Sequence, residues 1–225
     1  MLPLGRPPTV SLTVDSPTHL TASSAGLTPR HTLSVHDCDG ANREWVVDST
    51  VAKVSIFNSQ NLTLRLNGRN LTSTVEVFKC RDVRIVVGPK NSPAATDSEA
   101  AEPPQPLGTL QLDPPLDNVA IEYASPTHVG KIVIAPLPSE DALGRATFGF
   151  SQLSFRSASE AEPTVLFDER GALHFPGQSG ERPVVISPGV GGFDVARQLV
   201  VSCGQDGRWQ VTGLERGEKD CPVMA

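Results

Sequence analysis

The sequence has little of what helical, membrane-spanning or disulfide-bonded proteins depend on. Aromatic residues make up 5% of the 225 residues, charged residues 20%, and no apolar run approaches the length of about 20 residues that spans a bilayer. The N-terminus lacks the apolar core of a signal peptide. The four cysteines are too few and too scattered for a disulfide framework; they are Cys38, Cys80, Cys203 and Cys221. We therefore expect reduced cysteines, no membrane association and a cytoplasmic location.

Charge and ligand spacing exclude two further classes of function. The net charge of −6 argues against nucleic acid as the main partner, because affinity for nucleic acid depends on neutralising phosphates. The run His36-Asp37-Cys38-Asp39 holds four potential metal ligands, but adjacent ligands rarely reach one metal and no second cluster follows at a recognised spacing. We interpret this run as a polar turn before the first strand, and we expect no metal or cofactor.

A repeat of 21 residues is the strongest signal in the chain. The 20 prolines and 19 glycines favour many short strands and turns over helices. A shift of 21 residues superimposes Val54 on Val75, Ile56 on Val77, Phe57 on Phe78, Ser59 on Cys80, Leu62 on Val83, Leu64 on Ile85 and Leu66 on Val87. Within each copy the apolar residues alternate, which indicates strands, and Asn61 or Asp82 favours a turn before the second strand. A fixed period near 20 residues predicts the stacked coils of a parallel β-helix.

Further copies follow the first two. Val119 lies 36 residues after Val83, which equals one repeat of 21 plus an insertion of 15, and Leu110 and Leu112 precede it one residue out of register. The strands continue with Ile132 and Ile134, then Leu153 and Phe155, then Leu173 and Phe175, at steps of 22, 21 and 20. This pattern predicts about six coils between Val46 and Ile186, with Trp45 covering the open end of the core.

The remaining segments differ in composition from the coils. Residues 1–35 are rich in Pro, Ser and Thr and are expected to form a flexible arm, although residues 10–14 alternate as an edge strand does. The domain proper spans 36–217, with a disordered insertion at 89–106 and a flexible tail at 218–225. Residues 198–202 and 209–212 are predicted to form a C-terminal β-hairpin around the turn at 204–207.

Outward positions of the two matched coils form a basic stripe on an acidic protein. It contains Lys53, Thr63, Arg65, Lys79, Arg81 and Arg84. The stripe is either a solvated sheet face or a docking surface for an acidic partner. Outward acids such as Glu76 and Glu122 are isolated in the sequence, whereas β-helix enzymes that cleave carbohydrates need clustered carboxylates. We therefore do not expect an enzyme.

Several short motifs point to a known family. Trp45-Val46-Val47 precedes the coils, and near the end stand Val185-Ile186-Ser187-Pro188, Gly191-Gly192-Phe193 and Gly207-Arg208-Trp209-Gln210-Val211-Thr212. In this order the chain resembles, over residues 36–217, the C-terminal domain of adenylyl cyclase-associated protein.

The resemblance implies a fold and a function. The fold is an all-β, right-handed parallel β-helix that forms a homodimer by exchanging C-terminal strands. The implied function is binding of monomeric ADP-actin and promotion of ADP-to-ATP exchange, in the cytoplasm with the cytoskeleton. Carried onto this chain, the actin contacts are Lys53, Arg65, Arg84, Trp209, Gln210, Val211 and Thr212. The dimerisation strands contain Leu199, Val200, Val201, Trp209 and Val211.

The chain departs from the family in ways that leave alternatives open. The helical N-terminal domain, the proline-rich tract and the Leu-Lys-Lys segment of the family are not found, so the sequence matches a minimal, β-helix-only form. Residues 214–217 also differ from the usual ending of the family. A tubulin-cofactor-C-like β-helix that activates small GTPases needs an arginine finger in a Gln-Leu-Arg motif. This chain has Arg81, Arg84 and Arg197-Gln198-Leu199, none in that order. A cytoskeletal scaffold is the third possibility.

Overall fold

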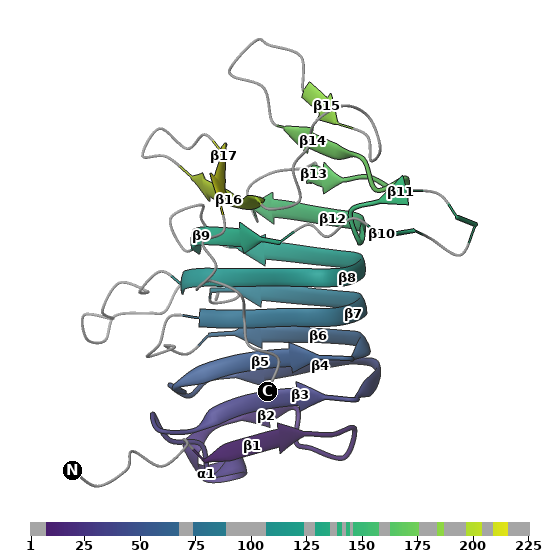
Figure 1. The fold of residues 1–225 in the computed structure, drawn as a ribbon. Helices are drawn as coiled ribbons and strands as arrows, with labels where there is room; N and C mark the ends of the chain where they lie inside the picture. Colours follow the sequence, from purple (N-terminus) through teal and green to yellow (C-terminus); the bar gives the residue numbers. More distant parts are fainter. Residues whose placement is uncertain are drawn as a thin grey trace, which may run out of the picture.

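The chain folds into a tall stack of strands (Figure 1). The computed structural model describes residues 8–67, 74–88, 107–123, 129–135, 139–140, 143–144, 146–157, 163–175, 184–186, 197–203 and 209–215. In these residues the secondary structure is a large and mostly parallel sheet with one helix of four residues, which confirms the all-β class that the sequence predicts. The predicted insertion at 89–106 and tail at 218–225 lie outside the described residues.

Two parallel ladders make up the stack. The first ladder contains β1 (Thr9–Leu12), β3 (Thr32–His36), β5 (Lys53–Phe57), the first halves of β7 (Thr74–Val87) and β8 (Leu107–Tyr123), and β9 (Val129–Ile134). The second contains β2 (His19–Leu20), β4 (Asp39–Val47), β6 (Gln60–Leu66), the second halves of β7 and β8, and β12 (Phe150–Ser157). Within the described residues, six two-strand units therefore succeed one another in parallel.

The 21-residue repeat sets the register of the central strands, as predicted. Pairs that lie opposite each other include Val54 and Val75, Ile56 and Val77, Leu62 and Val83, and Leu64 and Ile85. Their inward side chains form one continuous hydrophobic core that runs along the stack. Apolar residues at every second position therefore face this core, because side chains alternate between the two faces of a strand.

The one-residue difference at the third copy, which contains Leu110 and Val119, is also confirmed. Val75 lies opposite Leu110 and Val83 lies opposite Val119, so the turn inside β8 holds one residue more than the turn inside β7. Leu110 in turn lies opposite Ile132, at the predicted step of 22.

Beyond Ile134 the predicted stacking is wrong. Leu153 lies opposite Val119, not Ile132. The strand that carries Ile132, β9, is instead covered by the antiparallel strand β16 (Arg197–Cys203). An alternation of apolar residues identifies a strand but not its neighbour, because any strand with one apolar face fits the same core.

The parallel stacking also ends earlier than predicted, at β12 and not near Ile186. After β12 the chain forms β13 (Thr164–Phe167), β14 (Leu173–Phe175) and β15 (Val184–Ile186), which pair in antiparallel fashion. Leu173 and Phe175 therefore do not continue the parallel ladder at a step of 20. Two short strands, β10 (Ser139–Glu140) and β11 (Ala146–Thr147), lie between β9 and β12 in sequence and pair with each other in antiparallel fashion.

At the N-terminus regular structure begins earlier than predicted. Much of the expected flexible arm forms β1, β2, α1 (Ala22–Ala25) and β3, with β1 at the edge as the alternation at 10–14 suggested. Thr21 caps α1 by accepting a hydrogen bond from the Ser24 N–H at 3.1 Å. Trp45 does not close the core, because β4 has strands on both sides; the buried side chains nearer the end are Leu12, Leu20 and Leu27. The two-residue strand β2 and the four-residue helix α1 are too short to show a periodic pattern.

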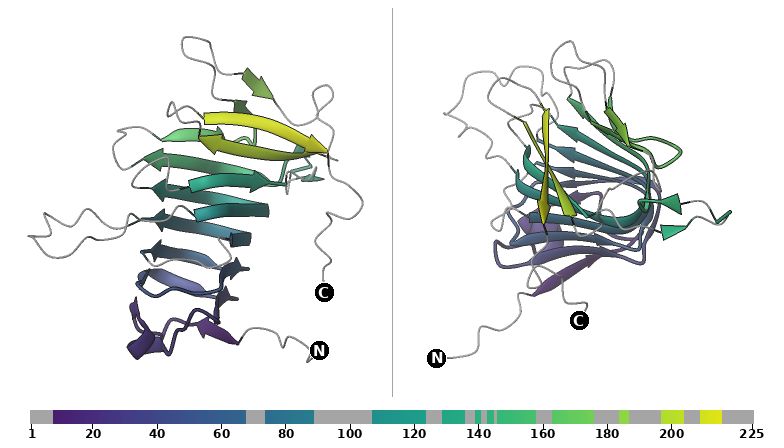
Figure 2. Two further views of the ribbon diagram at one scale, coloured as in Figure 1. Left: turned by 90° about the vertical axis from the view of Figure 1, so that its left-hand side faces the viewer. Right: turned by 45° about the horizontal axis from the view of Figure 1, so that its top comes forward.

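The C-terminal strands β16 and β17 (Trp209–Glu215) pair in antiparallel fashion, as the predicted hairpin requires. They lie across the end of the stack farthest from β1 (Figure 2). The predicted hairpin turn at 204–207 lies outside the described residues. Among the residues that the structure describes, no helix has the length and apolar character needed to cross a membrane.

Gly40 occupies a place where the neighbouring strand leaves no room for a side chain. A Cβ at this position would lie 2.5 Å from the Leu62 Cβ and 2.8 Å from the Asn61 carbonyl oxygen. We expect Gly40→Ala to lower the free energy of unfolding by about 1–3 kcal/mol, because the two strands must move apart. The matched control is Gly26→Ala, where no atom lies within 4 Å and only the positive φ of 63° opposes the substitution. Urea denaturation measures both variants, and equal losses would contradict the steric explanation.

Candidate binding groove at the corner

Between the two ladders the chain turns at a corner, and residues with positive φ make the turn. Two columns of such residues stack along the corner: Asp37, Asn58 and Lys79 with φ of 50°, 47° and 53°, and Asn61, Asp82, Asn118 and Gln152 with φ of 54°, 52°, 52° and 53°. Asn and Asp tolerate this left-handed conformation better than other residues with a side chain. The turn predicted at Asn61 and Asp82 is therefore confirmed, and its physical basis is the backbone conformation.

Side chains of these columns connect successive units by hydrogen bonds. Asn118 donates to Asp82 at 2.6 Å between Nδ2 and Oδ1, and Asn58 donates to Asp37. Asp39 accepts hydrogen bonds from the amides of Gln60 at 2.9 Å and Asn61 at 3.0 Å. The corner is thus held both by backbone pairing and by a ladder of amides and carboxylates.

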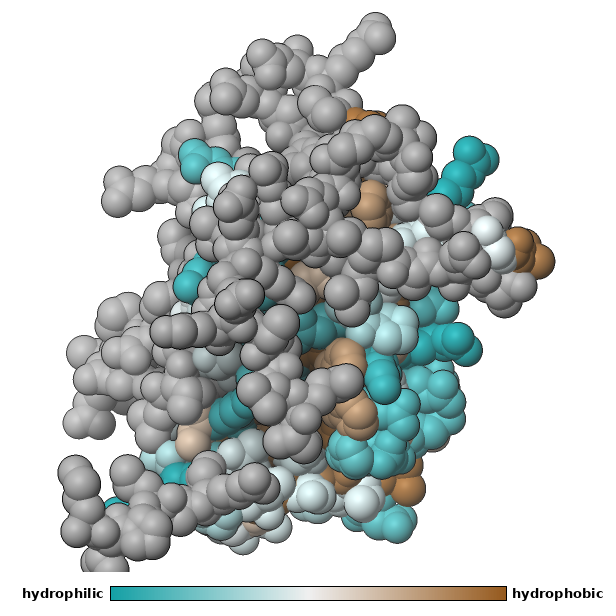
Figure 3. Space-filling view, viewed as in Figure 1, coloured by the Kyte–Doolittle hydropathy of each residue, from teal (hydrophilic) through white to brown (hydrophobic). Residues whose placement is uncertain are grey.

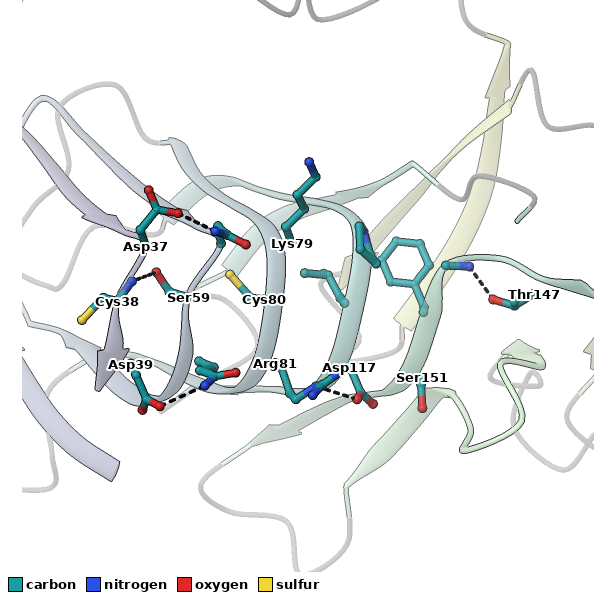
Figure 4. A pocket seen from close by; sticks show the side chains of 16 residues that line it. Asp37, Cys38, Asp39, Ser59, Lys79, Cys80, Arg81, Asp117, Thr147 and Ser151 are labelled. Carbon is teal, nitrogen blue, oxygen red and sulfur yellow. Dashed lines mark hydrogen bonds and ion pairs between the residues drawn. The ribbon is translucent and has the colours of Figure 1, made fainter. Parts of the chain in front are cut away.

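A groove with a volume of about 890 Å³ follows this corner along the stack (Figure 4). Its floor consists of the residue at the centre of each turn, namely Cys38, Ser59, Cys80, Leu116 and Phe150. Its rims consist of the residues on either side, which include Asp37, Asn58 and Lys79 on one rim and Asp39, Gln60, Arg81, Asp117 and Ser151 on the other. We call this feature the corner groove. In the space-filling view hydrophilic residues gather on the side of the stack where β7 and β8 bend (Figure 3).

The electrostatics of the groove favour binding by charge over thiol chemistry. Hydrogen bonds from Gln60, Asn61 and the Ala41 N–H hold the pKa of Asp39 below its ordinary range, so this carboxylate is ionised at neutral pH. Burial raises the pKa of Cys80, and burial together with the charge of Asp39 raises the pKa of Cys38. Both thiols are therefore protonated and weakly nucleophilic.

Lys79 departs from the pattern of its column. It is a lysine at φ 53°, where the two units below have Asp and Asn. Its ammonium lies 5.7 Å from the ring centroid of Phe57 and 5.2 Å from that of Phe78, within the range of cation–π attraction. His36 stacks on Phe57 at 4.7 Å between ring centroids, so an aromatic column borders this rim of the groove.

Four cations of the predicted basic stripe, Lys53, Arg65, Arg81 and Arg84, pair with acids on neighbouring strands. Lys53 pairs with Glu76 at 2.6 Å between Nζ and Oε1, and Arg65 pairs with Glu44 at 2.7 Å between Nε and Oε1. Arg81 pairs with Asp117 at 3.2 Å. Each pair joins residues that are distant in sequence and opposite or diagonal in the ladder, which the sequence alone did not show.

Glu122, which has no neighbouring carboxylate in the sequence and was expected to be isolated, is the centre of an ion triad. It accepts a hydrogen bond from Arg84, and another from Arg156 at 2.6 Å. Burial alone would raise the pKa of Glu122, but the hydrogen bonds and charges of the two arginines outweigh burial and hold this pKa below its ordinary range. Glu76 was likewise expected to be isolated and instead pairs with Lys53.

The structure does not gather the predicted actin contacts into one site. Arg65 and Arg84 lie on neighbouring strands of the second ladder, whereas Lys53 lies on β5 of the first ladder. Gln210 and Thr212 are exposed on β17, at the far end of the stack, in the strand that also contains Trp209 and Val211.

The predicted dimerisation strands pair within their own chain. Leu199 and Val201 on β16 are buried in the hydrophobic core, and Val200 between them is half-buried. β16 lies between β9 and β17, so both of its edges are occupied. Any exchange between copies would therefore have to replace one of these pairings.

Sequence reasoning missed the corner groove, although its signal was present. Asp-Cys-Asp at 37–39, Asn-Ser-Gln at 58–60 and Lys-Cys-Arg at 79–81 recur at the same step of 21 residues as the strands. The run at 36–39 is the first of these corners and is a polar turn as predicted, but it joins β3 to β4 and does not precede the first strand. No group of three His, Cys, Asp or Glu side chains suited to a metal ion occurs within the described residues.

Comparisons with known proteins do not identify a family. No protein-family model matches the chain, and neither a curated protein nor a solved structure is significantly similar to it.

Acidification should remove the contribution of the ion triad. We expect Glu122→Gln to lower the free energy of unfolding at pH 7 by up to about 1 kcal/mol. Because the pKa of Glu122 is lowered in the folded state, its stabilisation is complete above the unfolded-state pKa of about 4.3 and is lost as the pH falls further through the folded-state pKa. The measurement is urea denaturation of both proteins between pH 7 and pH 3.

The control for this experiment is Glu169→Gln, because Glu169 accepts its hydrogen bond from the neutral amide of Gln152 at 2.7 Å. The difference in free energy of unfolding between wild type and Glu122→Gln should shrink on acidification. The corresponding difference for the control should change less. A difference for Glu122→Gln that is constant from pH 7 to pH 3 would contradict the assignment.

Proposed function

We propose that this chain is an actin monomer-binding protein built on a right-handed parallel β-helix of about six coils. The observation that carries the proposal is the order of its elements: two-strand units with Asn or Asp at the corner, followed by an antiparallel hairpin. This order is the one that the resemblance to the cyclase-associated protein domain implies. The six parallel two-strand units between Thr9 and Ser157 support the proposed coil number.

Exposure distinguishes the proposed actin contacts. The side chains of Lys53 and Arg84 are 35% and 46% exposed, so a carboxylate on actin can compete for them. The side chain of Arg65 is only 10% exposed and is committed to Glu44, so its role is to hold the strands. We therefore assign the main electrostatic contacts to Lys53 and Arg84, with β17 as a second contact region.

The activity that follows is regulation of actin dynamics by ADP-to-ATP exchange on the monomer. Purified chain should bind ADP-actin and accelerate release of a fluorescent nucleotide in the same cuvette. Binding without faster release would make the chain a sequestering module. No binding would contradict the proposal and favour the tubulin-cofactor-C-like or scaffold alternative, although Arg81 and Arg84 are both engaged by carboxylates.

Charge reversal at the Lys53–Glu76 pair separates a contact role from a structural one. We expect Lys53→Glu to weaken actin binding at least tenfold, because it removes a cation and places two carboxylates side by side. The double variant Lys53→Glu/Glu76→Lys restores the ion pair but leaves the charges exchanged. If Lys53 contacts actin, the double variant stays weak; full recovery of binding would show that the pair only stabilises the fold.

We also propose that the chain forms a homodimer through exchange of its C-terminal strands. Deleting 198–225 should convert a dimer to a monomer and weaken actin binding, with mass measured by light scattering. Because this deletion also uncovers β9, the shorter deletion of 209–225 serves as the second variant, since β16 can remain on β9. A dimer that survives both deletions would contradict strand exchange.

A further inference from the structure

The two rims of the corner groove change charge together along the stack. In the unit at 37–39 both rim residues are aspartates, and in the unit at 58–60 both are amides. In the unit at 79–81 they are Lys79 and Arg81. Parallel strands are spaced by about 4.8 Å, so the acidic pair and the basic pair are separated by about 9.6 Å. The groove therefore has an acidic section and a basic section at a fixed distance.

These charged groups face solvent. The side chains of Asp37 and Arg81 are 57% and 64% exposed, and Asp39 and Lys79 are also exposed. Asp39 is held by the neutral amides of Gln60 and Asn61, which orient the carboxylate without neutralising it. Asp37 contacts His36 at 2.8 Å and Arg81 contacts Asp117 at 3.2 Å, but both contacts are surface pairs, which contribute little and can be exchanged for others.

Lys79 is the only lysine among the positive-φ residues of the described corner, and its ammonium lies over the rings of Phe57 and Phe78 at the edge of the groove. The left-handed conformation favours Asn or Asp, which the same column uses at 37 and 58. A non-glycine residue held in such a conformation is a reason to look for function at that point. Lys79 lies beside the floor residue Cys80, opposite Arg81 (Figure 4).

We propose that the corner groove binds an extended segment of a partner protein that carries a basic residue and an acidic residue three positions apart. The basic side chain lies between Asp37 and Asp39, and the acidic side chain lies between Lys79 and Arg81. Leu116 and Phe150 continue the floor beyond the basic section, but their side chains are buried in the core, so the contacts of the segment are with the rims.

The spacing selects the conformation of the segment. In a polyproline II helix residues i and i+3 project to the same side about 9.3 Å apart, which matches the separation of the two charged sections. In a β-strand residues i and i+3 project to opposite faces. In an α-helix they are only about 5–6 Å apart. This site is separate from the proposed actin contacts, so its test does not depend on actin.

The probe is a fluorescein-labelled peptide, Pro-Pro-Arg-Pro-Pro-Glu-Pro-Pro, titrated with the full chain and followed by anisotropy. The control peptides replace the charged pair by Arg and Arg or by Glu and Glu, at the same spacing. We expect the mixed-charge peptide to bind at least tenfold more tightly than either control, and its binding to weaken as salt is raised. Equal binding of the three peptides, or no binding of the mixed one, would overturn the proposal.

Substitutions on the rims test the assignment of each section. Lys79→Asn/Arg81→Gln should weaken binding of the mixed peptide at least tenfold, whereas Lys131→Asn, which removes an exposed lysine of β9, should not. Asp37→Lys/Asp39→Lys should shift the preference to the Glu and Glu peptide. Thermal melting of Lys79→Asn should show little change in stability, because the better backbone preference of asparagine offsets the lost cation–π contacts with Phe57 and Phe78. Unchanged peptide affinity or preference in these variants would show that the groove is not the site.

Discussion

The fold depends on a backbone bend that recurs at the same points of successive two-strand units in the middle of the stack. Residues such as Asn58 and Asn61 take a left-handed conformation on either side of the turn, and their counterparts one repeat later do the same. If one bend moved by a single residue, the inward side chains of the following strand would face solvent. The amide and carboxylate ladder at the corner, including Asn118 on Asp82, therefore fixes the register on which the whole core depends.

Charged side chains are arranged differently on the flat faces of the stack and at the corner. On the flat faces Lys53, Arg65, Arg84 and Arg156 each have a carboxylate on a neighbouring strand, as Lys53 has Glu76. Exposed pairs of this kind add little stability, but they leave a face with little net charge. At the corner, charges of one sign stand on both rims of the same unit, as Asp37 and Asp39 do. Arg81 at the corner also has a carboxylate, Asp117, so what distinguishes the corner is the like charge on its two rims, which the proposed peptide site uses.

The two ends of the stack are covered in different ways. At the N-terminal end short strands and the capped helix α1 lie beside the buried Leu12, Leu20 and Leu27. At the other end the strand β16 runs antiparallel to β9 and buries Leu199 and Val201. Covering the last strand matters because an exposed edge of a parallel stack is a template for pairing with another chain. The proposed dimer uses this same region.

The sequence by itself determined the all-β class, the 21-residue register from Val54 to Val87 and the turns at Asn61 and Asp82. These features follow from local causes, namely alternation of apolar side chains and residues that tolerate positive φ. Only the tertiary structure decided that Leu153 pairs with Val119, that β16 covers β9 and that Glu122 holds two arginines. These features depend on which strands become neighbours, and apolar alternation is the same for every strand that shares the core. The corner groove lies between the two cases, because its residues repeat in the sequence but become a groove only when the units stack.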